Sequence, residues 1–294
     1  MSSDREQRAR AREESRDRRV SAREQSRERR IEQRERRRRE RRADGAPQAP
    51  IWTRPEPGAR RARLTREEIA RAALQIADAD GIAALSMRRV ARDLGVGTMS
   101  LYYYVETKAE LLDLMHDAMM GEVIVADGEL PRDWRGALEL IARRALAAIQ
   151  RHPWSLSGPI ALPGPNALRH FDQSLAAVSD LDLDLQARFE IILAVDDYVF
   201  GYALREAEDQ REEAAWDESQ LDKTVAAYFE AQLATGGYPQ IEQIREGQDP
   251  HEMMRRIRGY ARDPERFEHG LKRLLDGIAL ELGADPGNPP RASE

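Results

Sequence analysis

The stretch from residue 86 to residue 108 constrains the fold of this chain more than any other part of the sequence. It reads SMRRVARDLGVGTMSLYYYVETK. Ser86 suits a helix N-terminus, because its hydroxyl accepts a hydrogen bond from a free backbone N–H of the first turn. Three apolar residues then follow at helical spacing: Val90, Ala91 and Leu94. Gly95-Val96-Gly97 is expected to end this helix, because glycine reaches left-handed backbone angles without strain.

A second short helix is predicted from about Thr98 to Val105. Leu101 and Val105 are expected to point inward, and the other side chains face elsewhere: Thr98, Met99, Ser100, Tyr102, Tyr103 and Tyr104. Two short helices around a glycine-containing turn form the helix-turn-helix unit, whose second helix can enter a DNA major groove. Three consecutive tyrosines on a short exposed helix need a cover, and DNA would provide one.

Composition restricts the remaining classes of protein. The chain has 294 residues, enough for two globular units, and no cysteine, which excludes a disulfide framework and a cysteine nucleophile. No apolar run approaches the ~20 residues of a membrane span. The arginine-rich N-terminus lacks the hydrophobic segment of a secretory signal, so a cytoplasmic protein is expected.

The net charge of -6 hides an asymmetry. Residues 1–63 hold 22 basic and 12 acidic residues, which leaves 25 of the 47 basic and 41 of the 53 acidic residues to the rest of the chain. Residues 1–42 are too polar to bury a core, so we expect a disordered or transiently helical arm. Its arginines, notably 36–39, 41 and 42, are hypothesised to contact phosphates. Residues 43–58 are rich in Pro and Gly and predict a linker.

Capping boxes mark two more helices of the same unit. Thr65 and Glu68 are spaced for a box that opens a first helix, which is expected to end near Gly81. Thr107 and Glu110 repeat the spacing and open a fourth helix. Three small helices and a long connecting helix therefore account for residues 65 to about 122.

These four helices, in this order, resemble the DNA-binding domain of the TetR family of transcriptional regulators from Leu64 to Val123. The residues that carry the resemblance are Ala79-Asp80-Gly81, Leu85 to Ala91, Leu94-Gly95-Val96, Leu101-Tyr102, Val105 and Lys108 to Leu112. Roughly residues 132–285 resemble the ligand-binding domain of the subgroup that contains the tetracycline repressor. That likeness rests on His152-Pro153-Trp154, Gly164 to Arg169 and Tyr198 to Tyr202.

The resemblance implies an all-α homodimer that binds a palindromic operator and releases it when a small molecule enters the larger domain. The expected divisions are an extension and linker (1–60), a DNA-binding domain (61–122), a ligand-binding and dimerisation domain (123–285) and a tail (286–294). The positions expected to meet DNA are Arg88, Thr98, Met99, Ser100, Tyr102, Tyr103, Tyr104 and Lys108, with Arg61 and Arg63 near flanking phosphates. The alternative for the three tyrosines is packing against neighbouring helices.

The larger domain is expected to hold five helices separated by loops. They are residues 134–150, 167–178, 186 to about 207, 221–233 and 264–282, with an acidic loop over 208–220. The helix at 264–282 is expected to pair with that at 186–207 across a two-fold axis.

A ligand pocket is predicted from side chains with apolar bodies and polar tips. They are His152, Trp154, Asn166, His170, Phe171, Tyr198 and Tyr202, and for each one a core or surface role is the alternative. The histidines that a tetracycline–magnesium site would need do not stand at the matching segments, which read Gly121 to Ile124 and Ser157 to Ile160. The inducer is therefore a small molecule that the sequence does not identify.

Enzymatic functions and cofactors are not expected. The Gly95 turn follows a helix rather than a strand and lacks the dinucleotide fingerprint. His251 to Arg255 lacks the second histidine of a zinc protease helix, and five scattered histidines form no metal cluster. Asp196 and Asp197 are helical neighbours that point about 100° apart, so they do not converge on one site.

The alternative function is sequence-independent nucleic-acid binding driven by the basic arm. In the favoured one, ligand moves the helix at 107–121 and changes the spacing of the recognition helices.

Overall fold

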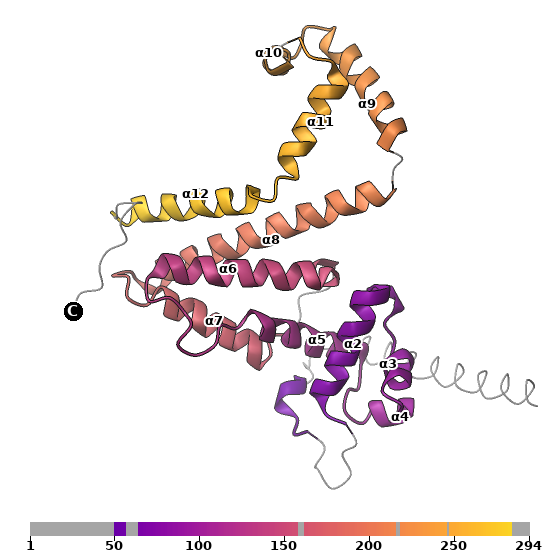
Figure 1. Ribbon diagram of the computed structural model, residues 1–294. Coiled ribbons are helices and arrows are strands. Elements are labelled where there is room, and N and C mark those ends of the chain that lie inside the picture. Colours follow the sequence, from indigo (N-terminus) through magenta and orange to yellow (C-terminus); the bar gives the residue numbers. More distant parts are fainter. Residues whose placement is uncertain (1–49, 57–63, 158–161, 216–217, 246, 284–294) are drawn as a thin grey trace, which may run out of the picture. The chain divides into compact units, whose positions relative to one another are not determined.

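The computed structural model describes residues 50–56, 64–157, 162–215, 218–245 and 247–283. Within these ranges every regular element is a helix, which confirms the all-α prediction. The chain divides into two compact units, Met1–Pro55 and Glu56–Glu294. The described part of the first unit contains the short 3₁₀ helix η1 (Ile51–Thr53). The second unit holds all the elements that follow (Figure 1).

Helix α2 (Arg66–Asp80) begins and ends as its sequence predicts. The Thr65 hydroxyl accepts from the Glu68 backbone N–H at 3.1 Å, and the Glu68 carboxylate accepts from the Thr65 N–H at 2.8 Å. This reciprocal capping box satisfies two donors that the helix leaves open. Gly81 ends the helix at a φ of 80°, and the 3₁₀ turn η2 (Ile82–Ala84) follows.

Helices α3 (Met87–Asp93) and α4 (Thr98–Leu101) form the predicted helix-turn-helix. The Ser86 hydroxyl caps α3 by accepting from the Arg89 N–H at 3.2 Å, and Gly95 turns the chain at a φ of 66°. Helix α4 is shorter than the predicted range to Val105, because the backbone after Leu101 continues as turns. Leu101 and Val105 nevertheless point inward as predicted and are fully buried.

Helix α5 (Lys108–Val123) joins the helix-turn-helix unit to the larger domain. The Thr107 hydroxyl caps it through the Glu110 N–H at 3.1 Å, but the Glu110 carboxylate accepts from the Glu106 N–H rather than from Thr107. One side of α5 packs against α2, and it also contacts helices of the larger domain, α6 (Trp134–Arg151) and α7 (Pro165–Ala177). A movement of α5 would therefore alter its packing both against α2 and against the larger domain.

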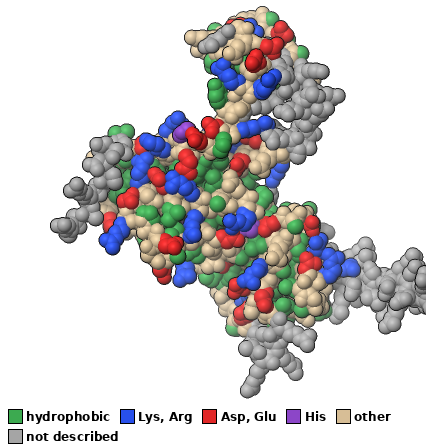
Figure 2. Space-filling model, in the orientation of Figure 1, with side chains coloured by type: hydrophobic (Ala, Val, Ile, Leu, Met, Phe, Trp, Pro, Cys, Tyr) green, Lys and Arg blue, Asp and Glu red, His purple; other side chains and the backbone are tan. Residues whose placement is uncertain are grey.

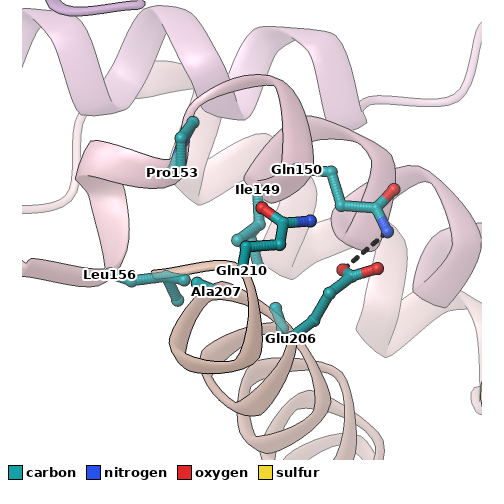
Figure 3. A pocket seen from close by; sticks show the side chains of 8 residues that line it. Ile149, Gln150, Pro153, Leu156, Glu206, Ala207 and Gln210 are labelled. Atoms are coloured by element: carbon teal, nitrogen blue, oxygen red, sulfur yellow. Dashed lines mark hydrogen bonds between the residues drawn. The ribbon is translucent and has the colours of Figure 1, made fainter. Parts of the chain in front are cut away.

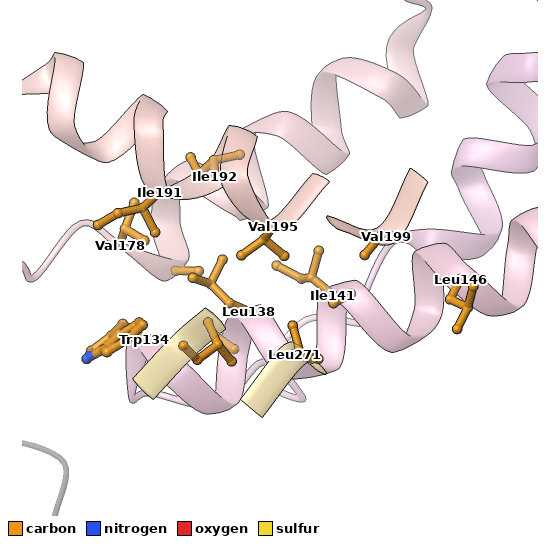
Figure 4. Packing of buried hydrophobic residues seen from close by; sticks show 14 of the residues in the cluster. Trp134, Leu138, Ile141, Leu146, Val178, Ile191, Ile192, Val195, Val199 and Leu271 are labelled. Atoms are coloured by element: carbon orange, nitrogen blue, oxygen red, sulfur yellow. The ribbon is translucent and has the colours of Figure 1, made fainter. Parts of the chain in front are cut away.

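The larger domain is built around α6, α8 (Leu185–Ala215) and α12 (Arg266–Glu281). Figure 4 shows the core between them, where α8 and α12 supply side chains that converge on α6. The labelled core residues are Trp134, Leu138, Ile141, Leu146, Val178, Ile191, Ile192, Val195, Val199 and Leu271. The short helix η3 (Pro153–Ser157) links α6 to the segment before α7.

Four helices of the larger domain differ from the sequence prediction. Residues 208–215, predicted as loop, continue α8, because they contain good helix formers and neither glycine nor proline. Helix α9 (Glu218–Leu233) begins three residues earlier than predicted. Two unpredicted helices, α10 (Pro239–Arg245) and α11 (Pro250–Ala261), precede α12, and α11 packs against α9. No helix in the described ranges has the length and apolar character that crossing a membrane requires.

Candidate nucleic-acid interface and effector site

The helix-turn-helix presents an exposed surface formed by α4 and the turn after it, which we call the recognition surface (residues 98–103). Tyr103 is 73% exposed and Met99 is 53% exposed, and Ser100 is exposed beside them. Thr98 and Tyr102 are half-buried at its edge. Exposing large apolar side chains to water is unfavourable, so this surface is suited to binding a partner.

Tyr104 differs from its two neighbours. Its side chain is only 6% exposed, and its ring meets the edge of the Tyr103 ring with 5.7 Å between the centroids. This burial agrees with the packing alternative, and the predicted DNA contact of Tyr104 stays a prediction.

Two predicted cations flank the recognition surface. Arg88 is exposed on α3, and Lys108 is exposed at the start of α5, where its Nζ donates to the Leu85 carbonyl at 3.0 Å. Arg89 was not predicted, yet it joins α3 to α2 through an ion pair with Asp80 at 2.8 Å. The predicted contacts of Arg61, Arg63 and the arginine-rich arm lie outside the described residues.

Charge on the visible face is mixed. Figure 2 shows acidic and basic side chains interspersed with apolar ones over the described residues of this face, without a broad basic area. The described residues of this face therefore offer no broad basic surface to phosphates.

The structure places the seven predicted pocket residues in three separate locations. His152 and Trp154 lie together beside α2, where both hydrogen bond to Asp78. Tyr198 stacks on Phe267, and Tyr202 meets the same ring edge-on. The Tyr198 hydroxyl donates to the Phe267 carbonyl at 2.8 Å.

The other three lie on α7. The Asn166 side chain donates to the Asp117 carbonyl at 3.1 Å, and the Phe171 ring lies 5.3 Å from that of Phe189. His170 is half-buried, and the partial loss of hydration lowers its pKa. Whether any of the seven binds a ligand stays a prediction.

A different set of residues lines a pocket of about 110 Å³ between α6, η3 and α8. Figure 3 shows these side chains around the opening, with the Gln150 amide donating to the Glu206 carboxylate at 2.8 Å. The lining residues are Ile149, Gln150, Pro153, Leu156, Ala203, Glu206, Ala207 and Gln210. Five of the eight are apolar, and the rest supply two amides and a carboxylate, a mixture typical of small-molecule sites.

Polar contacts tie α5 to the larger domain. The buried Asp117 carboxylate accepts from the backbone N–H groups of Asn166 and Ala167, at 2.9 and 3.1 Å, and so caps the N-terminus of α7. Gln173 bonds the backbone of Val125 in both directions, at 3.0 and 2.6 Å. The connecting helix is therefore held at several points by the domain expected to bind ligand.

No group of three or more His, Cys, Asp or Glu side chains suited to a metal occurs within the described ranges. What the described residues do combine is an exposed helix-turn-helix and a larger helical domain joined by one helix. This combination is that of a DNA-binding protein whose second domain contacts the helix-turn-helix domain.

Comparison with known proteins agrees with this class. Residues 69–115 match the family described as bacterial regulatory proteins, tetR family, and residues 127–282 match the tetracyclin repressor-like C-terminal domain. The chain therefore belongs to the TetR family of bacterial regulatory proteins. The two matches confirm the resemblance inferred from the sequence.

Individual relatives extend over most of the chain. The HTH-type transcriptional repressor DrrR1 of Streptomyces coeruleorubidus is 36% identical over 226 residues, 74% of this chain and 78% of the relative. An HTH-type transcriptional regulator of Saccharopolyspora erythraea is 33% identical over 63% of this chain and 79% of its own length. The crystal structure of the Streptomyces coelicolor TetR family protein ActR in complex with actinorhodin superposes with a TM-score of 0.55. It is 26% identical and covers 76% of this chain and 100% of its own.

Proposed function

We propose that this chain is a transcriptional repressor that binds operator DNA as a homodimer and leaves it when a small molecule enters the larger domain. The observation that carries the proposal is the recognition surface, whose Met99 and Tyr103 side chains are exposed although the helices behind them are fully packed. A member of this family with such a surface reads DNA in the major groove. Repression agrees with the name of the relative DrrR1.

The contacts divide into those that read bases and those that set position. Arg88 suits a guanine edge or a phosphate, and Met99 suits a thymine methyl group. Thr98 and Ser100 suit a phosphate or base edge, whereas Tyr102 and Lys108 suit phosphates, which set register without carrying sequence information. Tyr103 is the most exposed of the set, and we expect it to bury the largest apolar area against DNA.

Dimerisation is proposed through α8 and α12. Leu193 and Phe200 of α8 are 53% and 49% exposed, and Leu280 of α12 is 67% exposed. Two copies of this pair of helices, related by a two-fold axis, would cover these side chains in a four-helix interface. Sedimentation of the purified full-length chain should give the mass of a dimer.

The effector site is proposed in the larger domain, where the pocket between α6, η3 and α8 is the site that the structure supports. Its volume of about 110 Å³ is below the roughly 300–1,000 Å³ of most ligand sites, so binding requires the pocket to widen. ActR is a relative that has been crystallised with a small molecule, actinorhodin. We propose that widening displaces α5 and alters the separation of the two recognition surfaces.

The chain is proposed to have no enzymatic activity and to act in the cytoplasm, where its DNA lies. Selection of genomic fragments by the purified protein, followed by footprinting, tests the function. A protected palindrome with half-sites about one helical turn apart is the expected result. Broad, salt-sensitive binding without a preferred site would contradict it and would favour coating of nucleic acid by the basic arm.

A further inference from the structure

One carboxylate lines the pocket between α6, η3 and α8 without a cationic partner. It belongs to Glu206 of α8, whose side chain is half-buried. Among the described residues its hydrogen bond comes from the Gln150 amide, at 2.8 Å, and no ion pair there includes it (Figure 3). An ionised carboxylate offers about four acceptor positions, so most of those of Glu206 are left open.

The rest of the pocket wall supplies no positive charge. Five of the eight lining residues are apolar, two are neutral amides, and no lysine, arginine or histidine is among them. Arg151, at the end of α6, is paired with Glu122. Arg205 precedes Glu206 on α8, and helical neighbours point about 100° apart. Asp209 lies three residues after Glu206 on the same side of α8 and adds a second negative charge. The electrostatic potential at this pocket is therefore negative.

A ligand that fills the pocket must compensate the Glu206 carboxylate, because it displaces water from that group. A carboxylate that loses its hydration without gaining an opposite charge is destabilised. A neutral alcohol donates one hydrogen bond, whereas an ammonium group donates up to three and supplies the opposite charge. An anion would lie beside Glu206 with no lining cation to offset the repulsion. The apolar residues of the wall favour a hydrophobic body in the same ligand.

We propose that this pocket binds an organic cation, a protonated amine attached to an apolar ring or chain. The ammonium group meets Glu206, and the apolar body lies against Ile149, Leu156 and Ala207. The Gln210 amide oxygen is a second acceptor for the same group. The preference for a cation follows from the lining residues alone, whereas the role of this cation as the effector rests on the proposed function.

The pocket adjoins the contact between the two domains, which we call the domain junction (Asp78, His152 and Trp154). Pro153 and Leu156 of η3 line the pocket, and the Trp154 Nε1 of the same short helix donates to the Asp78 carboxylate in α2 at 2.9 Å. In a 3₁₀ helix residues three apart share a face, so Pro153 and Leu156 lie together and Trp154 points elsewhere. A cation that displaces η3 therefore acts on an element that is bonded to α2.

Titration of the full-length chain with three compounds of one size tests the preference. They are 2-phenylethylammonium, the neutral 2-phenylethanol and the anion phenylacetate. One ring is the right size, because the pocket volume is about 110 Å³ and a cavity of roughly 150 Å³ holds benzene. Binding is followed at the Ile149 methyl signal of protein with ¹³C-labelled isoleucine methyl groups, which Ile149→Leu assigns. We expect the cation to bind at least about tenfold more tightly than the alcohol, and phenylacetate to bind most weakly.

Variants show whether Glu206 is the cause. In Glu206→Gln the preference for the cation over the alcohol should fall to about twofold or less, because no charge needs compensation. Glu208→Gln is the matched control, since it removes the same charge from an exposed position that faces away from Glu206, and it should keep the tenfold preference. Ethylammonium, which has the charge without the ring, should leave the Ile149 signal unchanged where 2-phenylethylammonium saturates it.

Three results would overturn the cation site: equal binding of the three compounds, an Ile149 signal that 2-phenylethylammonium does not shift, or a preference that survives in Glu206→Gln. Footprinting of the selected genomic fragment reports on the proposed function separately. A protected palindrome without a preference for the cation would contradict the site and support the repressor. The preference without a palindrome would support the site and contradict the repressor.

Discussion

The recognition surface and the domain junction treat their side chains in opposite ways. Met99, on the four-residue helix α4, and Tyr103, in the turn after it, are exposed, and no described element of the chain covers them. At the junction the side chains are polar, and His152, Asp78 and Trp154 satisfy one another within the chain. The difference indicates that the recognition surface is free to bind a partner, whereas the domain junction holds the two domains together.

The largest effect is expected where the recognition surface is anchored. Leu101 is fully buried beneath it, so Leu101→Ala should lower the free energy of unfolding by about 2–5 kcal/mol. Met99→Ala, two residues earlier and 53% exposed, should change it by no more than about 0.5 kcal/mol. Urea unfolding of both variants at one protein concentration makes the comparison. Equal losses of unfolding free energy would mean that Leu101 does not support the recognition surface more than Met99 does.

Loss of a reading side chain should affect binding and leave folding intact. Tyr103→Ala should weaken operator binding by about 30-fold, the loss of roughly 2 kcal/mol typical of an interface tyrosine. Tyr228→Ala, on α9 and 62% exposed, removes the same ring from another surface and should bind normally. Fluorescence anisotropy on the selected fragment measures both, and thermal unfolding checks that each variant is folded. An unchanged affinity in Tyr103→Ala would contradict the claim that Tyr103 contacts DNA.

Polar contacts that hold α5 should matter less than the buried core. Asp117→Ala removes the acceptor for two backbone N–H groups at the start of α7, and should cost about 1 kcal/mol of stability. Asp127→Ala, an exposed carboxylate nearby in the sequence, should cost almost nothing. Denaturant titration distinguishes them. A neutral Asp117 variant would show that α7 does not depend on this cap.

The smallest effect concerns Asp196 on α8. Its side chain reaches the surface, but packing removes part of its hydration and, with the adjacent charge of Asp197, raises its pKa to about 6. The folded protein therefore holds this proton more tightly than the unfolded chain, and wild-type stability falls as the pH rises from about 4 to about 6.

Asp196→Asn should accordingly match the wild type near pH 4 and exceed its Tm by about 2 °C at pH 7, a small shift because exposure screens the charge. Asp182→Asn, an exposed carboxyl in the turn before α8, is the control. Calorimetric scans from pH 4 to pH 8 give the curve. A constant difference at all pH values would contradict the raised pKa.

Local signals in the sequence predicted the helix-turn-helix well. Thr65, Ser86 and Thr107 cap their helices as expected, because capping depends on residues within one turn. The end of α4 was not predicted, and the packing of Tyr104 was expected only as an alternative, because both depend on how the neighbouring helices pack. The acidic stretch after residue 207 was mistaken for a loop, since charge does not prevent a helix made of good helix formers.

The junction was the least predictable part of the site. His152 and Trp154 were assigned to a ligand pocket, whereas their partner Asp78 lies 74 residues from His152 in the chain. The sequence contains no spacing that brings these residues together, because the pairing is made by the packing of α2 against η3. Only the polar atoms of the His152 and Trp154 rings indicated that these side chains form specific hydrogen bonds in addition to packing.

The most direct measurement of the central claim is the ratio of affinities for the selected palindrome and for a scrambled duplex of the same length and composition. Both are measured at one salt concentration with the full-length chain. We predict that the wild type prefers the palindrome by about a thousandfold or more, and that Tyr103→Ala loses part of this preference while binding the scrambled duplex as before. Equal affinity of the wild type for the two duplexes would contradict sequence-specific recognition by residues 98–103.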